Sequence, residues 1–183
     1  MAEVVELAGY KLAKAASRAS PLMERTFNLK LTRHLKPPHL PDRVLAGMIG
    51  LDQASQVFLQ DLVTRILGLG KSHAALDKPD RLVALDAHLL LADQLRFEAL
   101  LRLGWLRSYP GREVELVLTV LEPERILRSE TRLEMPKNHP DFAEFNLRRE
   151  TDGQVVVRRL IPQGTKFFIQ RHGSGPPDSG SLA

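Results

Sequence analysis

The hydrophobic period of the chain changes at Tyr109-Pro110-Gly111. Before this turn, apolar residues recur every three to four positions, and after it they alternate with polar residues at every second position. One element cannot have both periods, because side chains repeat every 3.6 residues in a helix and every two in a strand. The sequence therefore predicts an α+β protein: an N-terminal helical region over about residues 1–108, packed on a C-terminal antiparallel β-meander of four to five strands over about 112–172.

Three main helices are predicted before the turn. They cover residues 3–17, residues 42–67 with a break near Gly50, and residues 79–107. Gly68 follows the second segment, where a glycine commonly ends a helix. The third segment has an apolar surface broader than one ordinary face, which indicates either a central place in the core or contact with a second chain. The central place is favoured, and the expected interaction surface consists of the leucines that widen the stripe: Leu90, Leu91, Leu95 and Leu101.

Two hairpins and a last strand are predicted after the turn. In the first hairpin, strands over residues 113–120 and 127–133 flank a turn at Pro123. The second pivots on Thr151-Asp152-Gly153 as a three-residue loop with Gly153 in the left-handed conformation, because this register leaves one face apolar. Lys166–Arg171 is the expected last strand. Residues 1–172 are interpreted as one domain, and residues 173–183, rich in Gly, Ser and Pro, as a flexible tail.

Composition limits the chemistry and the location of the chain. The absence of cysteine excludes disulfides, thiolate catalysis and cysteine zinc sites, and it fits a cytoplasmic location. No apolar run approaches the roughly 18 residues needed to cross a bilayer. Glu3 and Glu6 are untypical of a secretory signal peptide. The net charge of +4 is a mild excess that by itself decides no class of partner.

The potential metal ligands lack a recognised spacing. Asp86 and Asp93 share a face of the third predicted helix, but His88 lies about 160° around that helix from Asp86. No two histidines have the four-residue spacing of a helical zinc site, and no Glu-x-x-His element is present. We therefore predict no metal and no cofactor.

The segment Gly68-Leu69-Gly70-Lys71-Ser72 resembles the end of a phosphate-binding P-loop. That loop requires a preceding strand and an earlier glycine, whereas here a helix is predicted and Arg65 and Ile66 stand at the earlier positions. A glycine helix stop with a lysine near the last carbonyls explains all five residues, so no nucleotide site is predicted. No Gly-x-Ser-x-Gly or Ser-x-x-Lys motif supplies a nucleophile.

Basic and aromatic residues gather in the predicted sheet. Arg148, Arg158, Lys166 and Arg171 would lie on neighbouring strands, close to four of the seven phenylalanines. Sheets of this kind bind single-stranded nucleic acid, because charges follow the phosphates and rings stack on the bases. The register weakens this interpretation, since adjacent strand residues point to opposite faces. The neighbouring arginines Arg148-Arg149 and Arg158-Arg159 would therefore each be split between the two faces of the sheet. Nucleic-acid binding through Arg148, Arg158, Lys166 and Arg171 is therefore an alternative function.

The sequence favours a non-enzymatic role, because it contains no catalytic or cofactor motif. We predict a protein–protein interaction, scaffold or regulatory module that is able to self-associate. Nucleic-acid binding is the first alternative. The second is an enzyme whose Asp, Glu and His side chains are brought together only by the fold.

Overall fold

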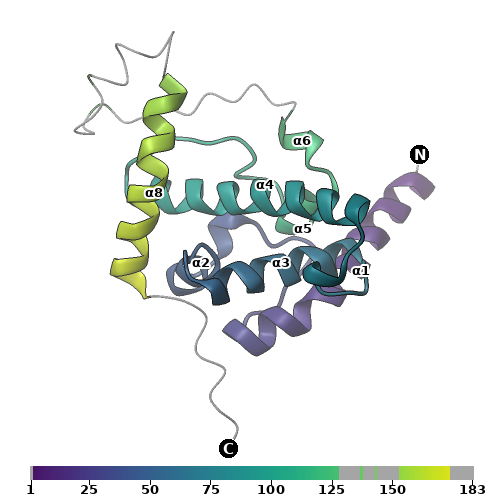
Figure 1. Ribbon diagram of the computed structural model, residues 1–183. Helices are drawn as coiled ribbons and strands as arrows, with labels where there is room; N and C mark the ends of the chain where they lie inside the picture. Colours follow the sequence, from purple (N-terminus) through teal and green to yellow (C-terminus); the bar gives the residue numbers. More distant parts are fainter. Residues whose placement is uncertain (1, 128–136, 138–142, 144–152, 174–183) are drawn as a thin grey trace, which may run out of the picture.

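Helices surround the central helix α4 in a computed structural model that describes residues 2–127, 137, 143 and 153–173 (Figure 1). Two 3-10 turns, η1 (Pro37–His39) and η2 (His73–Ala75), lie in the connections. The α-helices of the described residues are α1 (Ala2–Phe27), α2 (Asp42–Met48), α3 (Gln53–Leu67), α4 (Lys78–Arg102), α5 (Leu116–Leu121), α6 (Glu124–Leu127) and α8 (Gly153–His172).

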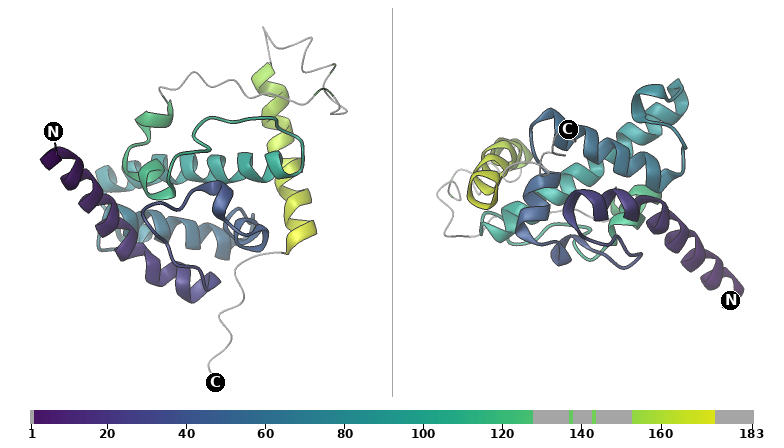
Figure 2. Two further views of the ribbon diagram at one scale, coloured as in Figure 1. Left: turned by 180° about the vertical axis from the view of Figure 1, so that it is seen from behind. Right: turned by 90° about the horizontal axis from the view of Figure 1, so that it is seen from below.

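The arrangement places most helices along α4 and one across its end. α3 packs between α1 and α4, and α5 contacts α4, α3 and α1. α8 crosses the C-terminal end of α4 steeply and also contacts α2 (Figures 1 and 2). The first turns of α1 extend beyond the rest of the molecule (Figure 2). α4 is thus in contact with four other helices, which explains why its apolar surface is so broad.

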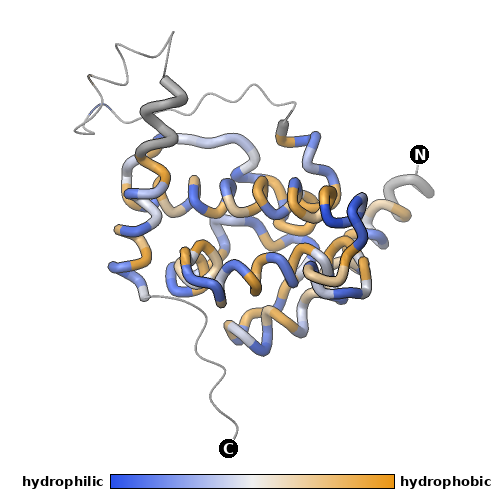
Figure 3. The backbone as a smooth tube through the Cα atoms, viewed as in Figure 1, coloured by the Kyte–Doolittle hydropathy of each residue, from blue (hydrophilic) through white to orange (hydrophobic). Residues whose placement is uncertain are grey.

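The core lies where α1, α3, α4 and α5 meet. Apolar and polar residues alternate along these longer helices, as expected for elements that bury one face (Figure 3). Side chains in the core that are no more than 1% exposed include Ala15, Ala19, Met23, Leu59, Leu62, Ile66, Leu91, Leu95, Leu116, Val117 and Phe168.

Local sequence signals set several helix ends, and the predicted helix stop at Gly68 is confirmed. The Asp52 carboxylate accepts a hydrogen bond from the Ser55 backbone N–H at 2.9 Å, and this cap begins α3 just after the predicted break. Asp77 caps α4 in the same way through the Asp80 N–H at 3.1 Å. Gly68 ends α3 in the left-handed conformation, with φ of 73°. The predicted helix over 79–107 is confirmed as α4, although it ends at Arg102.

The predicted α+β fold is wrong, because the described residues contain no β-strand. Part of the predicted first strand, 113–120, is the short helix α5 instead. Five of its six residues, Leu116 to Val120, are buried, so this helix has no polar face and leaves no helical period in the sequence. Its first N–H donates to the Leu35 carbonyl at 2.8 Å rather than to a neighbouring strand.

The predicted last strand, Lys166–Arg171, and its preceding turn at residues 162–164 are also wrong, because they lie inside α8. Pro162 and Gly164 weaken a helix in isolation, but here Gly164 allows close packing against α4. A Cβ added at Gly164 would lie 2.9 Å from Leu100 Cδ1.

The predicted second hairpin is wrong where it is described, since Gly153 begins α8 and residues 154–158 are helical. Three further predictions lie outside the described residues: the other strand of the second hairpin (144–150), most of the second strand of the first hairpin (127–133) and the tail beyond residue 173.

Candidate functional site

The four leucines of the predicted interaction surface are not exposed on α4. Leu91 and Leu95 are 0% exposed and belong to the core. Leu90 and Leu101 are half-buried, and Leu101 packs beside the contact of α4 with α8. The sequence identified the helix with the broad apolar surface, but not which side of it remains uncovered.

Three other leucines of α4 are exposed to solvent. Leu82 is 53% exposed, Leu85 38% and Leu89 52%. Their spacing of three and four residues places them on one face of the helix. That face points away from the core-facing Leu91, which lies about 120–180° around the helix from the three leucines. We call Leu82, Leu85 and Leu89 the outer leucine stripe.

The face of α4 that carries the outer leucine stripe is covered farther along the helix. Leu100 lies on the same face as Leu82, because eighteen residues make five full helical turns. Unlike Leu82, Leu100 is fully buried, in a cluster with Leu106 and with Leu160 of α8. α8 therefore covers the C-terminal end of this face at Leu100, while its N-terminal leucines are open and the ion pair Asp93–Arg96 lies between.

Opposite charges flank the outer leucine stripe. Lys78 lies one turn before Leu82, and Asp93 lies one turn after Leu89, both close to the line of the stripe. Arg96 forms an ion pair with Asp93 at 3.4 Å on the helix surface. Asp86 is exposed at the edge of the stripe. The stripe is thus bounded by Lys78 at one end and by the Asp93–Arg96 ion pair at the other.

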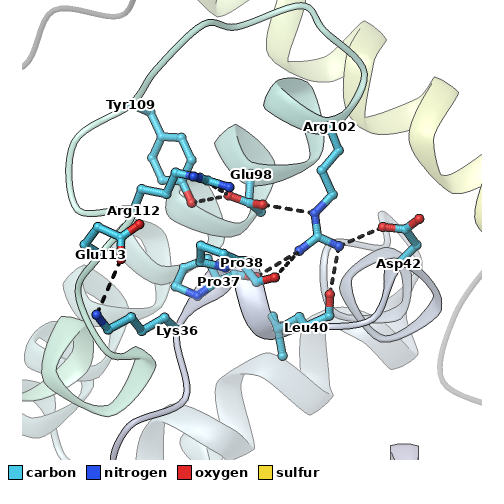
Figure 4. A network of polar contacts seen from close by, with 10 residues as sticks. All are labelled: Lys36, Pro37, Pro38, Leu40, Asp42, Glu98, Arg102, Tyr109, Arg112 and Glu113. Atoms are coloured by element: carbon cyan, nitrogen blue, oxygen red, sulfur yellow. Dashed lines mark hydrogen bonds and ion pairs between the residues drawn. The ribbon is translucent and has the colours of Figure 1, made fainter.

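A buried polar network lies at the C-terminal end of α4 (Figure 4). The Glu98 carboxylate is 1% exposed and accepts hydrogen bonds from the Tyr109 hydroxyl at 2.8 Å, from Arg112 Nε at 3.1 Å and from Arg102 Nε at 3.0 Å. Burial and the neighbouring Glu98 raise the pKa of Tyr109, which stays protonated as a donor. The hydrogen bond to Glu98 also raises the pKa of Arg112. Three donors hold this carboxylate, so the network joins α4 to the chain around Tyr109 and Arg112.

Arg102 joins this network to the extended connector before α2. Its Nη1 donates to the Leu40 carbonyl at 2.8 Å and to Asp42 at 2.7 Å, and its Nη2 donates to the Pro37 carbonyl at 3.0 Å (Figure 4). Carbonyl groups outside regular secondary structure lack the hydrogen bonds of a helix or a sheet, so they need other donors where the protein buries them. The helical sequence pattern did not reveal this role, because Arg102 resembles an ordinary basic residue near a helix end.

His88 is a buried histidine without a partner for one ring nitrogen. The residue is 5% exposed, and its Nδ1 has no hydrogen-bond partner among the described residues. Burial lowers the pKa of His88, and the charges of Arg96 and His73 lower it further. The imidazole is therefore neutral in the folded protein. Within the described part of the chain, no group of three or more His, Cys, Asp or Glu side chains could hold a metal ion.

The predicted nucleic-acid site is not assembled on a sheet where the structure describes it. Lys166 and Arg171 are both exposed on α8, but their five-residue spacing places them about 140° apart around the helix. The backbone of Arg158 is also in α8, whereas Arg148 lies outside the described residues. The two described cations do not share one face.

Comparisons with protein-family models, with curated proteins and with solved structures found no match to this chain. None of the helices that the structure describes is long and apolar enough to cross a membrane.

Proposed function

We propose that this protein is a non-enzymatic interaction module that self-associates through the outer leucine stripe of α4. The observation that carries the proposal is the exposure of Leu82, Leu85 and Leu89 on a face whose C-terminal end is covered by α8. Exposed apolar helix faces are typical contact surfaces, because their burial removes apolar area from water.

A second copy of this chain is the occupant that fits the charges. If two α4 helices pack antiparallel about a two-fold axis between Leu85 and Asp86, Leu82 lies opposite Leu89 of the other copy. The same axis places Lys78 of one copy opposite Asp93 of the other, since these two residues are equally far from the axis in the sequence. A parallel pair would instead place like charges together. Asp86 lies beside this axis, at the edge of the stripe, where its carboxylate is exposed to water.

The small size of the stripe indicates a weak dimer. Three partly exposed leucines provide much less than the roughly 800 Å² per partner of a standard interface. We therefore expect a dissociation constant of about micromolar or weaker. The cytoplasmic location is a prediction from the sequence alone. The same holds for protein partners other than a second copy of this chain.

Light scattering over a concentration series tests the proposal. We expect the native protein to pass from monomer to dimer, and Leu85→Glu to stay monomeric, because a charge would be buried at the centre of the interface. Glu keeps the helix propensity of Leu, so circular dichroism should be unchanged. Val57→Glu is the matched control, since Val57 is 46% exposed on α3. A native protein that stays monomeric disproves self-association, and a dimeric Leu85→Glu variant disproves the role of the stripe.

A further inference from the structure

A pocket of about 390 Å³ lies at the C-terminal end of α3. Its volume is in the lower part of the range of small-molecule sites. Six of its eight lining residues carry a charged or hydroxyl group: Arg18, Asp61, Thr64, Arg65, Lys71 and Ser72. The pocket is therefore a candidate site for a small polar ligand rather than an apolar one.

The charges of the pocket favour an anion. Three cationic side chains, Arg18, Arg65 and Lys71, face one carboxylate, Asp61. The Ser72 hydroxyl adds a neutral donor. Such a set provides donors with net positive charge, which is the chemistry that recognises a phosphate group.

Arg18 is held in place by the end of α3. Its Nε donates to the Arg65 carbonyl at 3.1 Å and its Nη2 to the Ile66 carbonyl at 2.6 Å. A Cβ at Gly68 would lie 2.9 Å from Arg18 Cζ, so this close approach requires the glycine. Among the described residues, Nη1 of Arg18 has no hydrogen-bond partner. The guanidinium both neutralises the last carbonyls of α3 and retains a donor.

The loop after α3 contributes backbone donors. In the described part of the chain, the N–H groups of Gly70, Lys71 and Ser72 form no hydrogen bond with the protein. Gly70 has φ of 67° and open space around it. Successive free N–H groups beside a lysine are a common cradle for phosphate oxygens. This loop is the Gly-Leu-Gly-Lys-Ser segment, which differs from a P-loop because a helix C-terminus precedes it.

We propose that this pocket binds the phosphate group of a small phosphate monoester. Lys71 and Arg65 provide the charge, and the N–H groups of residues 70–72 and the Ser72 hydroxyl provide directed donors. The carbonyl end of α3 and Asp61 oppose an anion, so binding is weaker than in a P-loop. The pocket is larger than one phosphate ion, and the rest of the volume accommodates the organic part of the ligand.

Amide NMR titrations at constant ionic strength test the proposal. The probes are inorganic phosphate and ribose 5-phosphate, with chloride in the reference titration. We expect saturable shifts at the amides of residues 70–72, with a dissociation constant of about 1 mM for ribose 5-phosphate and weaker binding of inorganic phosphate. Lys71→Met should weaken binding by about tenfold, because it removes a charge-assisted contact. Lys11→Met, an exposed lysine of α1, is the matched control and should have no effect.

Three results would overturn the proposal. The first is the absence of saturable shifts at residues 70–72 with either probe. The second is an equal effect of Lys71→Met and Lys11→Met, which would show non-specific attraction to a basic protein. The third is tighter binding of a single-stranded oligonucleotide that depends on Lys166 and Arg171, which would assign the anion site to α8. None of these results bears on the dimer, because the stripe variants are measured separately.

Discussion

The guanidinium of Arg102 lies against the carboxylate of Glu98, one helical turn earlier on α4, with Nε 3.0 Å from Oε1. The same guanidinium donates to the carbonyls of Pro37 and Leu40 in the connector before α2. One side chain thus satisfies a buried charge and fixes a segment more than sixty residues away in sequence. A planar fork with several donors is needed for this combination.

Arg102→Lys should lower the free energy of unfolding by about 1–3 kcal/mol, although it keeps the charge. An ammonium group cannot reach Glu98 and the carbonyls of the connector together. Urea unfolding followed by circular dichroism measures the difference. Arg96→Lys is the control, since Arg96 forms only a partly exposed ion pair with Asp93 at 3.4 Å and its replacement should change stability by less than about 0.5 kcal/mol. Equal effects of the two substitutions would contradict the role of Arg102.

Gly164→Ala should destabilise the protein, whereas Gly9→Ala should stabilise it. Both glycines lie inside helices, so each alanine gains about 1 kcal/mol of helix propensity. At Gly164 the new Cβ would meet the buried Leu100 at 2.9 Å, and α8 would have to move. At Gly9 it would meet only the end of the exposed Arg33 side chain, at 3.2 Å. Thermal unfolding of both variants distinguishes the two cases, and a stabilised Gly164→Ala protein would refute the close contact.

His88 should make the protein less stable below pH 6.5, which is the ordinary pKa of histidine. The folded-state pKa is lowered, so the unfolded chain binds a proton that the folded chain does not, and the free energy of unfolding falls as the pH falls. The loss is at most about 1.4 kcal/mol per pH unit until the folded-state pKa is reached. His88→Phe should reduce this slope in urea unfolding between pH 7 and pH 5. An unchanged slope would show that other groups cause it.

A charge exchange between Lys78 and Asp93 tests the antiparallel arrangement of the dimer. Lys78→Glu alone and Asp93→Lys alone should each weaken dimerisation severalfold, because each places like charges opposite one another. The double variant should restore it, since opposite charges face each other again. Sedimentation equilibrium at low salt measures the three constants, as exposed ion pairs are screened by salt. If the double variant dimerised no more tightly than the single variants, the pairing of Lys78 with Asp93 of the other copy would be excluded.

Local signals in the sequence were sufficient to predict α3 and α4 as helices. Gly68 was predicted to end α3 and does so, because capping depends on residues within one turn, whereas the Asp52 cap at the start of α3 was not predicted. The broad leucine surface also identified α4 as central. These features require no knowledge of distant residues, and the structure confirms them.

The tertiary structure alone decided the remaining elements and the site. α5 is a helix although Val114, Leu116, Leu118 and Val120 alternate, because burial on all sides removes the polar face that gives a helix its period. α8 stays helical through Pro162 and Gly164 because it packs against Leu100. α8 packs over only the C-terminal part of α4, and this contact decides which leucines of α4 remain exposed. The pocket forms because Arg18 of α1 reaches the C-terminal end of α3. Such contacts join residues far apart in sequence, so periodicity and propensity cannot report them.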